Sequence, residues 1–425
     1  MAEPLDGIRV VELSTGILGP MCGVYLSDMG ADVVKIEPPE GDMARYVRGV
    51  GNQLPPEVPS PFFTAVNRGK RSVVIAGHSA PGREALHRLA SEADVFLSNF
   101  RPEALASLGL DYETVRHLNP RLVYATATGF GAIGPEAGRG MVDGSGQARG
   151  GISSVTGQPG GPPLMAGAVI ADSAGGMLLA LGVVTALLAR ERHGVGQKVD
   201  TSALGGQLWL QSWELAHASM TGYRSGGQGS HHPIFSGVYG NYVTSDRRGL
   251  FLAAVPSPRD WEAFCDFGGI ADVAADPRWD TFQKRAGFDP TVPVEIVNQL
   301  RPFIAQAVAS RGLAEWEGFL SGRPEIIAHR VQDYSEVLND PQAILNGYFA
   351  ALHLPATGVH RVVGNVVGLS ATPGSVKAGP PGKGEHTDEV LRSLGYAPEE
   401  IGLIRSEADE ELVRRMKTLD LKPPD

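Results

Sequence analysis

A single carboxylate, Asp172, interrupts a long uncharged stretch of the chain. The ten residues before it carry no charge, and the next charged residue after it is Arg190. Ser-Ala-Gly-Gly and an aliphatic segment follow directly, so Asp172 can serve as the N-cap of a helix, where its carboxylate accepts backbone N–H bonds. Its neighbours are too small to cover it, so the same carboxylate can also attack a bulky electrophile while glycine N–H groups stabilise an oxyanion. The two roles are compatible.

Basic residues form a second group with possible chemistry. Cations on turns often do no more than contact solvent. As a set, however, these cations fall at the expected carboxyl ends of parallel strands, where a phosphate-bearing ligand binds in doubly wound sheets. The sequence therefore allows either solvated cations or a phosphate site. The residues and segments are Arg45, Arg48, 67–72, 99–102 and Arg139.

Other motifs fit their usual chemistry less well. Residues 129–134, GFGAIG, satisfy the dinucleotide-binding spacing after a strand, but PEAGRG follows instead of a helix, so we predict a loop. His231 and His232 lack the spacing of a metal site, and Cys22 and Cys265 are far apart in sequence. We therefore predict neither a metal site nor a disulfide framework.

The composition is that of a globular protein. The 425 residues are 42% hydrophobic, which allows a large core and suggests two or three domains. The formal net charge of -10 argues against a nucleic-acid partner, because phosphate binding needs concentrated Lys and Arg. The N-terminus lacks a signal-peptide pattern, and the most apolar run, 177–189, has 13 residues, too few to span a bilayer. We expect a soluble, cytoplasmic protein without a membrane partner.

Strands and helices alternate over roughly the first 200 residues, a βαβ pattern typical of a parallel sheet with helices on both faces. An amphipathic helix is predicted over 82–93, and the buried helix that follows Asp172 should end near His193 and Gly194. The sequence thus predicts an α/β fold with a Rossmann-like doubly wound large domain. Its buried strands are expected at 8–13, 31–37, 72–76, 94–99 and 122–128.

A second region begins after the Gly/Ser-rich segment 221–233. A hairpin is predicted over 237–255, and helical patterns continue to about residue 330. Strands return near 354–370, followed by a Pro/Gly-rich stretch and a charged C-terminal helix. This region predicts a smaller α/β domain.

Several stretches, taken together, resemble a known family, the class III CoA-transferases. This family includes formyl-CoA transferase and carnitine CoA-transferase and is related to α-methylacyl-CoA racemase. The stretches run in family order from residue 5 to about residue 396: LDGIRVVEL, LSDMGADVVKIEPPEGD, NRGKRSVVI, ADVFLSNFRPEALASLGLDYE, NPRLVYATATGFGAIGP, DGSGQARGG, ADSAGGM, GQKVDTS and GEHTDEVLRSLG.

The resemblance implies that Asp172 is the catalytic nucleophile. Its carboxylate would attack an acyl-CoA donor to give a mixed anhydride, and the released thiolate would then form an aspartyl-CoA thioester. A carboxylic acid acceptor would reverse these steps and leave as the new acyl-CoA. No tightly bound cofactor is implied, and coenzyme A enters as part of the substrate.

The resemblance also implies that CoA lies across the strand ends of the large domain. Family members often carry a basic residue at the position of Pro38 and a lysine at that of His78, so phosphate anchoring is expected to shift to Arg101, Arg45 or Arg139. The positions that match CoA contacts are Ile17, Leu18, Ile75, His78, Asn99, Phe100, Arg101 and the loop from Arg139 to Asp143.

The implied assembly is a homodimer of two interlocked ring-shaped chains. The large CoA-binding domain would span 1–200, followed by a linker at 201–229 and the small domain at 230–335. The C-terminal region, 336–425, would then return to the large domain, which it completes from about residue 340.

Three alternatives remain open at the level of sequence. The related racemases use an acid/base pair that includes a His shortly before the position of Asp143. No His lies between His117 and His193 in this sequence, which disfavours a racemase. An intramolecular CoA transfer would use the same nucleophile, and a non-catalytic acyl-CoA-binding protein would not use it. The acyl substrate is not defined by the sequence. Its pocket could involve residues that could equally belong to the core or a dimer contact: Trp209, Trp213, His231, His232 and Tyr239.

Overall fold

The computed structural model describes residues 2–55, 57–354 and 357–418, which form two compact units. The first unit contains Met1–Gly150, Gly167–Leu210 and Pro341–Asp425, and the second contains Gly151–Ala166 and Gln211–Asp340. The whole segment 151–166, predicted to belong to the large domain, is therefore part of the second unit. The first unit contains two hydrophobic cores, and the second unit contains one.

A six-stranded parallel sheet forms the centre of the first unit, which confirms the α/β prediction. The strand order is β3-β2-β1-β4-β5-β6, so the direction of strand addition changes between β1 and β4. A crevice at the carboxyl ends of two such strands is the usual ligand site of doubly wound sheets. All five predicted buried strands are present, and the sheet consists of β1 (Arg9–Leu13), β2 (Asp32–Glu37), β3 (Arg71–Val74), β4 (Val95–Ser98), β5 (Val123–Thr128) and β6 (Gln197–Ser202).

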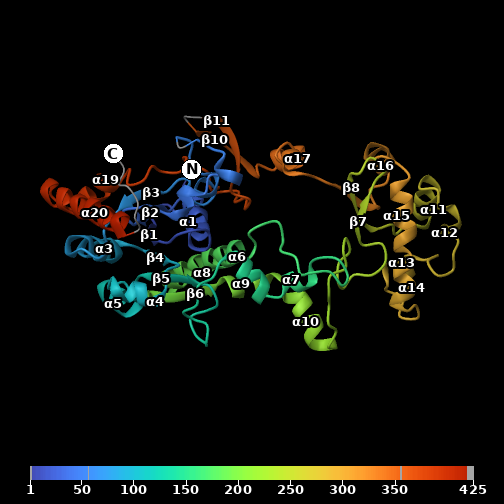
Figure 1. Cartoon of the computed structure of the whole chain (residues 1–425), viewed down its shortest axis with the longest axis horizontal. Coiled ribbons are helices and arrows are strands. Elements are labelled where there is room, and N and C mark those ends of the chain that lie inside the picture. Colours follow the sequence, from blue (N-terminus) through green and yellow to red (C-terminus); the bar gives the residue numbers. More distant parts are fainter. Residues whose placement is uncertain (1, 56, 355–356, 419–425) are drawn as a thin grey trace. The chain divides into compact units, whose positions relative to one another are not determined.

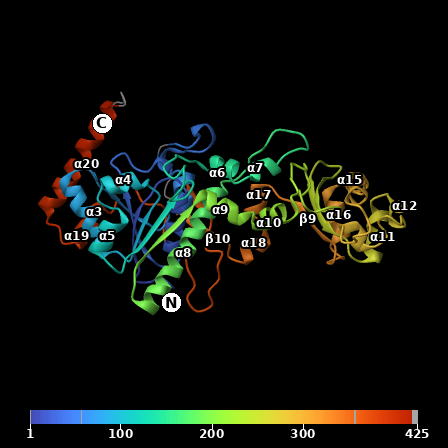
Figure 2. The same ribbon diagram turned by 90° about the horizontal axis from the view of Figure 1, so that it is seen from below.

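Helices cover both faces of this sheet (Figure 2). One core joins the sheet to helices that include the two C-terminal ones, so segments far apart in sequence lie side by side (Figure 1). The other core joins the opposite face to α1 and α8. The covering helices are α3 (Ala80–Glu92), α4 (Pro102–Ser107), α5 (Tyr112–Leu118), α19 (Thr387–Ser393) and α20 (Pro398–Thr418) on the first face, and α1 (Leu18–Asp28) and α8 (Ala171–His193) on the second.

The long apolar helix α8 ends as the sequence predicts. Its C-cap is Gly194, whose φ of 74° is the left-handed conformation that glycine adopts without strain. The helix has 23 residues, more than its apolar run, and is the one helix among the described residues that is long and apolar enough to cross a membrane. Leu179, Ala180 and Val183 pack in the core against the sheet, whereas Met177 and Leu181 are exposed.

Two glycines bring α8 and α9 (Ala203–Leu210) into close contact. A Cβ built on Gly206 would lie 2.4 Å from the backbone nitrogen and 2.8 Å from the Cα of Gly175. Real side chains do not approach backbone atoms this closely, so only glycine fits. The remaining elements of the first unit are the 3-10 helices Met43–Tyr46 and Val50–Asn52, α2 (Pro61–Asn67), α6 (Asp143–Arg149), α18 (Pro341–Leu345), and the antiparallel hairpin of β10 (Phe349–Leu354) and β11 (Gly358–Val363).

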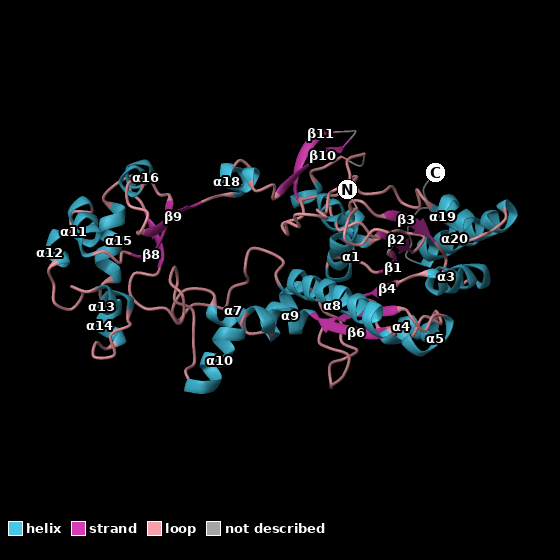
Figure 3. Ribbon diagram, turned by 180° about the vertical axis from the view of Figure 1, so that it is seen from behind, coloured by secondary structure: helices cyan, strands magenta, loops and turns pink. Residues whose placement is uncertain are grey.

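The second unit combines a three-stranded antiparallel sheet with helices (Figure 3). The hairpin predicted over 237–255 is confirmed, because β7 pairs antiparallel with β8. The range 201–229, predicted as a linker, contains α9 of the first unit and α10 of the second. The elements of the second unit are α7 (Ile152–Val155), α10 (Ser212–Thr221), β7 (Gly240–Val243), β8 (Gly249–Ala254), α11 (Pro258–Phe267), α12 (Ala271–Ala274), α13 (Phe282–Ala286), α14 (Val294–Asn298), α15 (Arg301–Ala309), α16 (Leu313–Leu320), β9 (Ile327–Val331) and α17 (Tyr334–Val337).

Gly206→Ala should lower the thermal midpoint of unfolding, because overpacking a tight contact typically costs ~1–3 kcal/mol. The matched control is Gly402→Ala in α20, where an added Cβ meets nothing within 4 Å and helix propensity improves. Circular dichroism melts of the three proteins test this expectation. An unchanged midpoint for Gly206→Ala would contradict the tight contact between α8 and α9.

Candidate active site

Asp172 lies in the first turn of α8, but it is not the N-cap. The N-cap position is occupied by Ile170, whose side chain makes no capping bond, so the N-cap prediction is wrong. Asp143, at the start of α6, supplies the missing acceptor. Its Oδ1 accepts the backbone N–H groups of Ala171 at 2.8 Å and Asp172 at 3.2 Å, and its Oδ2 accepts a 2.6 Å bond from Gln147. The helix is therefore capped by a carboxylate from another segment, and the Asp172 side chain is left free of that task.

The Asp172 carboxylate is half-buried and receives no hydrogen bond from any residue that the structure describes. Burial, with a smaller contribution from the negative charge of Asp143, raises the pKa of Asp172 to about 6. A helix N-terminus acts in the opposite direction, because its dipole favours a negative charge. Burial and the neighbouring charge outweigh that effect. At neutral pH the group is an ionised but poorly solvated carboxylate, the form in which an oxygen nucleophile is most reactive.

The glycines after Asp172 do not offer free N–H groups, contrary to the expectation from sequence. The N–H of Ala174 already bonds to the carbonyl of Ile170, so Gly175 and Gly176 lie beyond the unpaired first turn. They serve close packing instead. A Cβ on Gly175 would lie 2.5 Å from Leu18 Cδ1, and one on Gly176 would lie 2.6 Å from the Leu18 carbonyl oxygen. These contacts bring the start of α1 beside the helix turn that follows Asp172.

The loops after β1 and β4 meet where the strand order changes direction. The backbone N–H of Thr15 bonds to Asn99 Oδ1 at 3.0 Å, and Asn99 Nδ2 donates to the carbonyl of Thr15 at 2.7 Å. Ile17 and Leu18 follow on the first loop, as the N-cap and first residue of α1. Phe100 follows Asn99 on the second loop. The structure thus brings these predicted residues together at the carboxyl ends of β1 and β4.

Arg101 and the loop from Arg139 to Asp143 also approach each other. Arg101 is the N-cap residue of α4, and a Cβ on Gly140 would lie 2.9 Å from its Nη2. Among the described residues, the exposed Arg101 side chain forms no ion pair, whereas Arg139 pairs with Glu136 at 2.9 Å. Of the three predicted phosphate anchors Arg101, Arg45 and Arg139, Arg101 is therefore the one without an ion-pair partner among the described residues.

Ile75 and His78 follow β3, at the same carboxyl edge of the sheet. The Ile75 side chain is buried in the core, and its N–H bonds to the carbonyl of Glu37 at 3.2 Å. Ile75 could therefore contact a ligand only through its carbonyl oxygen. His78 is exposed on the following turn.

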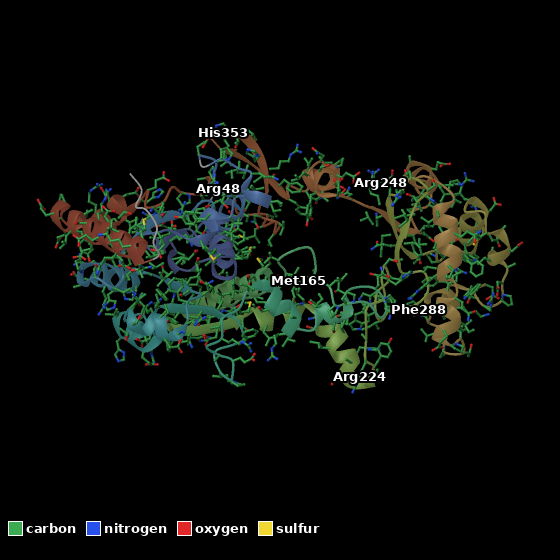
Figure 4. The ribbon with its side chains drawn as sticks, viewed as in Figure 1. Arg48, Met165, Arg224, Arg248, Phe288 and His353 are labelled. Carbon is green, nitrogen blue, oxygen red and sulfur yellow. The ribbon has the colours of Figure 1, made fainter. Side chains whose placement is uncertain are left out.

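Most of the other predicted basic residues bind groups of the protein itself. Arg45 forms two bonds to Glu37, at 2.7 and 2.6 Å, and Arg48, labelled in Figure 4, donates to backbone carbonyls that include Leu54 at 3.1 Å. Segment 67–72 contains the buried Arg68, which pairs with Asp28, and further paired cations. The sequence could not distinguish these internal ion pairs from ligand contacts.

The His and aromatic residues of the second unit pack mainly against each other. Trp213 stacks on His232 with ring centroids 5.5 Å apart, and Tyr239 contacts the same cluster. Burial lowers the pKa of His231 to about 4. Trp209 is an exposed residue of the first unit.

Residues 129–134 form a loop, as predicted. In the described part of the chain, no group of three His, Cys, Asp or Glu residues has a metal-binding arrangement.

Sequence reasoning missed one polar feature beside the loop that follows β1. Asp42 accepts a 2.8 Å bond from the Thr15 hydroxyl and also binds the ammonium of Lys35 at 2.8 Å. A signal was present in the sequence: Glu12 and Lys35 are charged residues within two mainly hydrophobic strands, which indicates that each has a buried partner of opposite charge. The register pairs these two residues directly.

Comparisons with known proteins agree over nearly the whole chain. The family described as CoA-transferase family III matches residues 5–387. The chain is 32% identical to the succinate–glutarate CoA-transferase of Agrobacterium fabrum, over 92% of this chain and 96% of the relative. It is also 32% identical to a formyl-CoA:oxalate CoA-transferase of Rhodopseudomonas palustris, over 95% and 96%. The crystal structure of a CaiB/BaiF family protein from Brucella suis matches with a TM-score of 0.79 and 28% identity, covering 93% of this chain and 100% of that one.

Asp143→Asn should lower the pKa of Asp172 below about 6, because the substitution removes a nearby negative charge and keeps an oxygen that can accept the N–H bonds of α8. Carbon-13 NMR of aspartate carboxyls, titrated with pH, measures the shift, and the Asp172 signal is the one lost in Asp172→Asn. Asp111→Asn, at the N-cap of α5, is the control. An unchanged Asp172 pKa in Asp143→Asn would show that the charge of Asp143 has no influence.

Proposed function

Because the chain belongs to CoA-transferase family III, we propose that it moves CoA from an acyl-CoA donor to a carboxylic acid with Asp172 as the covalent carrier. The observation that supports this role most directly is the desolvated Asp172 carboxylate, which has no hydrogen-bond donor among the described residues and a pKa of about 6. Its helix packs against Leu18, which begins α1 directly after the loop that follows β1. The proposed nucleophile and the carboxyl edge of the sheet, where we expect CoA to bind, thus belong to the same compact unit.

The proposed reaction has two symmetrical halves. An Asp172 oxygen attacks the donor carbonyl, the C–S bond breaks, and a mixed anhydride and CoA thiolate result. The thiolate attacks the aspartyl carbonyl, and the donor acid leaves with one former Asp172 oxygen, which gives the aspartyl-CoA thioester. The acceptor carboxylate then expels the thiolate to form a second anhydride. Attack of the thiolate on the acceptor carbonyl forms the new acyl-CoA and restores Asp172 with one acceptor oxygen.

Groups around Asp172 favour this chemistry. Asp143 fixes the first turn of α8 and so orients the carboxylate, in keeping with the large effect of positioning on reaction rates. In the first turn of α8, the N–H of Ser173 has no partner among the described residues. We assign this N–H as a donor to the developing oxyanion, in place of the glycines.

We place CoA along the carboxyl edge of the sheet, where anions commonly bind in doubly wound folds. Arg101, with Arg139 beside it, would bind the phosphates. Ile17, Leu18, Asn99, Phe100 and the carbonyl of Ile75 would contact the remainder of the CoA, with His78 and Asp143 at either end of the site. Arg45 is left out, because Glu37 already binds its guanidinium.

We further propose that two copies assemble as an interlocked homodimer. Exposed apolar side chains follow helical spacing along α8, at Met177, Leu181, Val184 and Leu188. Such a stripe is typical of a surface that another chain covers.

The cytoplasmic location remains a prediction.

Asp172→Ala should abolish transfer and leave the affinity for free CoA nearly unchanged, because the side chain does not cap α8. In the wild-type protein, hydroxylamine added with donor acyl-CoA should convert Asp172 to a hydroxamate, which peptide mass spectrometry detects. Ser173→Ala, which loses only the hydroxyl bonded to the Val169 carbonyl, is the control and should still be trapped. A wild-type protein that binds acyl-CoA but never forms the hydroxamate would support a non-catalytic binding protein.

Turnover should require a separate carboxylic acid. The named relatives act with succinate, glutarate or oxalate, so these acids begin the acceptor panel. Purified protein is incubated with one acyl-CoA, with and without each acid, and products are measured by mass spectrometry. Rearranged acyl-CoA without added acid would indicate intramolecular transfer. Exchange of the α-proton with deuterated solvent would instead indicate a racemase.

A further inference from the structure

A buried network of charged side chains lies beside the loop between β1 and α1. None of its members is the proposed nucleophile, Asp172. Lys35 and Lys70 both bind Glu12, at 3.2 and 2.7 Å, and all three side chains are fully buried. Lys35 also binds Asp42 at 2.8 Å. Gly23 of α1 leaves room for this network, since a Cβ there would lie 1.8 Å from Glu12 Oε2.

Asp42 connects this network to the loop between β1 and α1. One oxygen, Oδ2, binds Lys35, and the other, Oδ1, accepts the Thr15 hydroxyl at 2.8 Å, the Gly16 N–H at 3.3 Å and the Ala44 N–H at 2.8 Å. Despite its burial, the charge of Lys35 keeps the pKa of Asp42 below its usual range, so it is an ionised acceptor. Lys35 also donates to the Ser14 carbonyl at 2.8 Å. Three successive residues of the loop are therefore bound by one ion pair.

The opposite side of the same loop is bound by Asn99 through the two bonds to Thr15. The loop is thus fixed from β2 and from β4, directly before Ile17 and Leu18. Polar contacts to Ser14, Thr15 and Gly16 therefore hold the loop from two neighbouring strands.

We propose that the Lys35–Asp42 pair, acting through the Thr15 hydroxyl, is a positioning device that holds the β1–α1 loop in its CoA-binding conformation. This inference rests on the proposed function. Stability alone gives little reason to keep such a network, because buried ion pairs are often no more stabilising than apolar residues of similar size. Fixing a ligand-binding loop in advance reduces the entropy lost when the ligand binds.

The test removes only the outermost bond of the network. Thr15→Val deletes the hydroxyl and keeps the side-chain shape, and Thr15→Ser keeps the hydroxyl. We expect Thr15→Val to weaken the binding of free CoA about 5- to 10-fold, less than the full effect of one hydrogen bond to a charged acceptor, because the bonds to Ser14, Gly16 and the Thr15 backbone remain. Thr15→Ser should bind within about twofold of the wild type. The kcat with saturating donor should change much less than the Kd.

Isothermal titration calorimetry with free CoA gives the Kd, and a thermal melt reports folding for each protein. The control is Thr291→Val in the second unit, which removes a comparable 2.6 Å bond from a Thr hydroxyl to Asp289. A folded Thr15→Val with unchanged Kd, or a Thr15→Ser as weak as Thr15→Val, would overturn the positioning role. A wild-type protein that neither binds CoA nor transfers it would overturn the proposed function as well.

Discussion

An incompletely solvated carboxylate at the start of a helix is the feature on which the account of this protein depends. Helix N-termini have unpaired N–H groups, and a nearby Asp usually satisfies them with its own side chain. Here Asp143 performs that task for α8 from another segment. Asp172 therefore lies in the first turn, but its carboxylate does not cap the helix. Burial raises the pKa of this carboxylate to about 6.

The packing around α8 follows from the same requirement. A reactive side chain at a helix start must be close to whatever binds the substrate, and a bulky residue in the next turn would keep neighbouring elements away. Gly175 and Gly176 instead allow the start of α1 to touch α8, and Gly206 does the same for α9. Small residues thus bring the first turns of α8 against the start of α1, while the buried Lys35–Asp42 pair binds the loop between β1 and α1.

Local patterns in the sequence were sufficient for much of the fold. The five buried strands, the end of α8 at Gly194 and the β7–β8 hairpin could be predicted because hydrophobic periodicity and glycine conformation act over a few residues. The cap of α8 could not, because its donor and acceptor are 28 residues apart. The pairing of Arg45 with Glu37 could not be predicted for a related reason, because the two residues meet only in the folded structure, where Glu37 is buried. The pairing of Glu12 with Lys35 likewise becomes visible only with the strand register.

The measurement that tests the central claim most directly follows oxygen atoms rather than rates. An acceptor acid labelled with oxygen-18 in its carboxylate is turned over with an unlabelled acyl-CoA, and the peptide that contains Asp172 is weighed by mass spectrometry. If Asp172 carries the acyl group and then CoA, its carboxylate gains oxygen-18 from the acceptor. If new acyl-CoA accumulates while the Asp172 carboxylate stays unlabelled, the transfer bypasses that side chain and the account is contradicted.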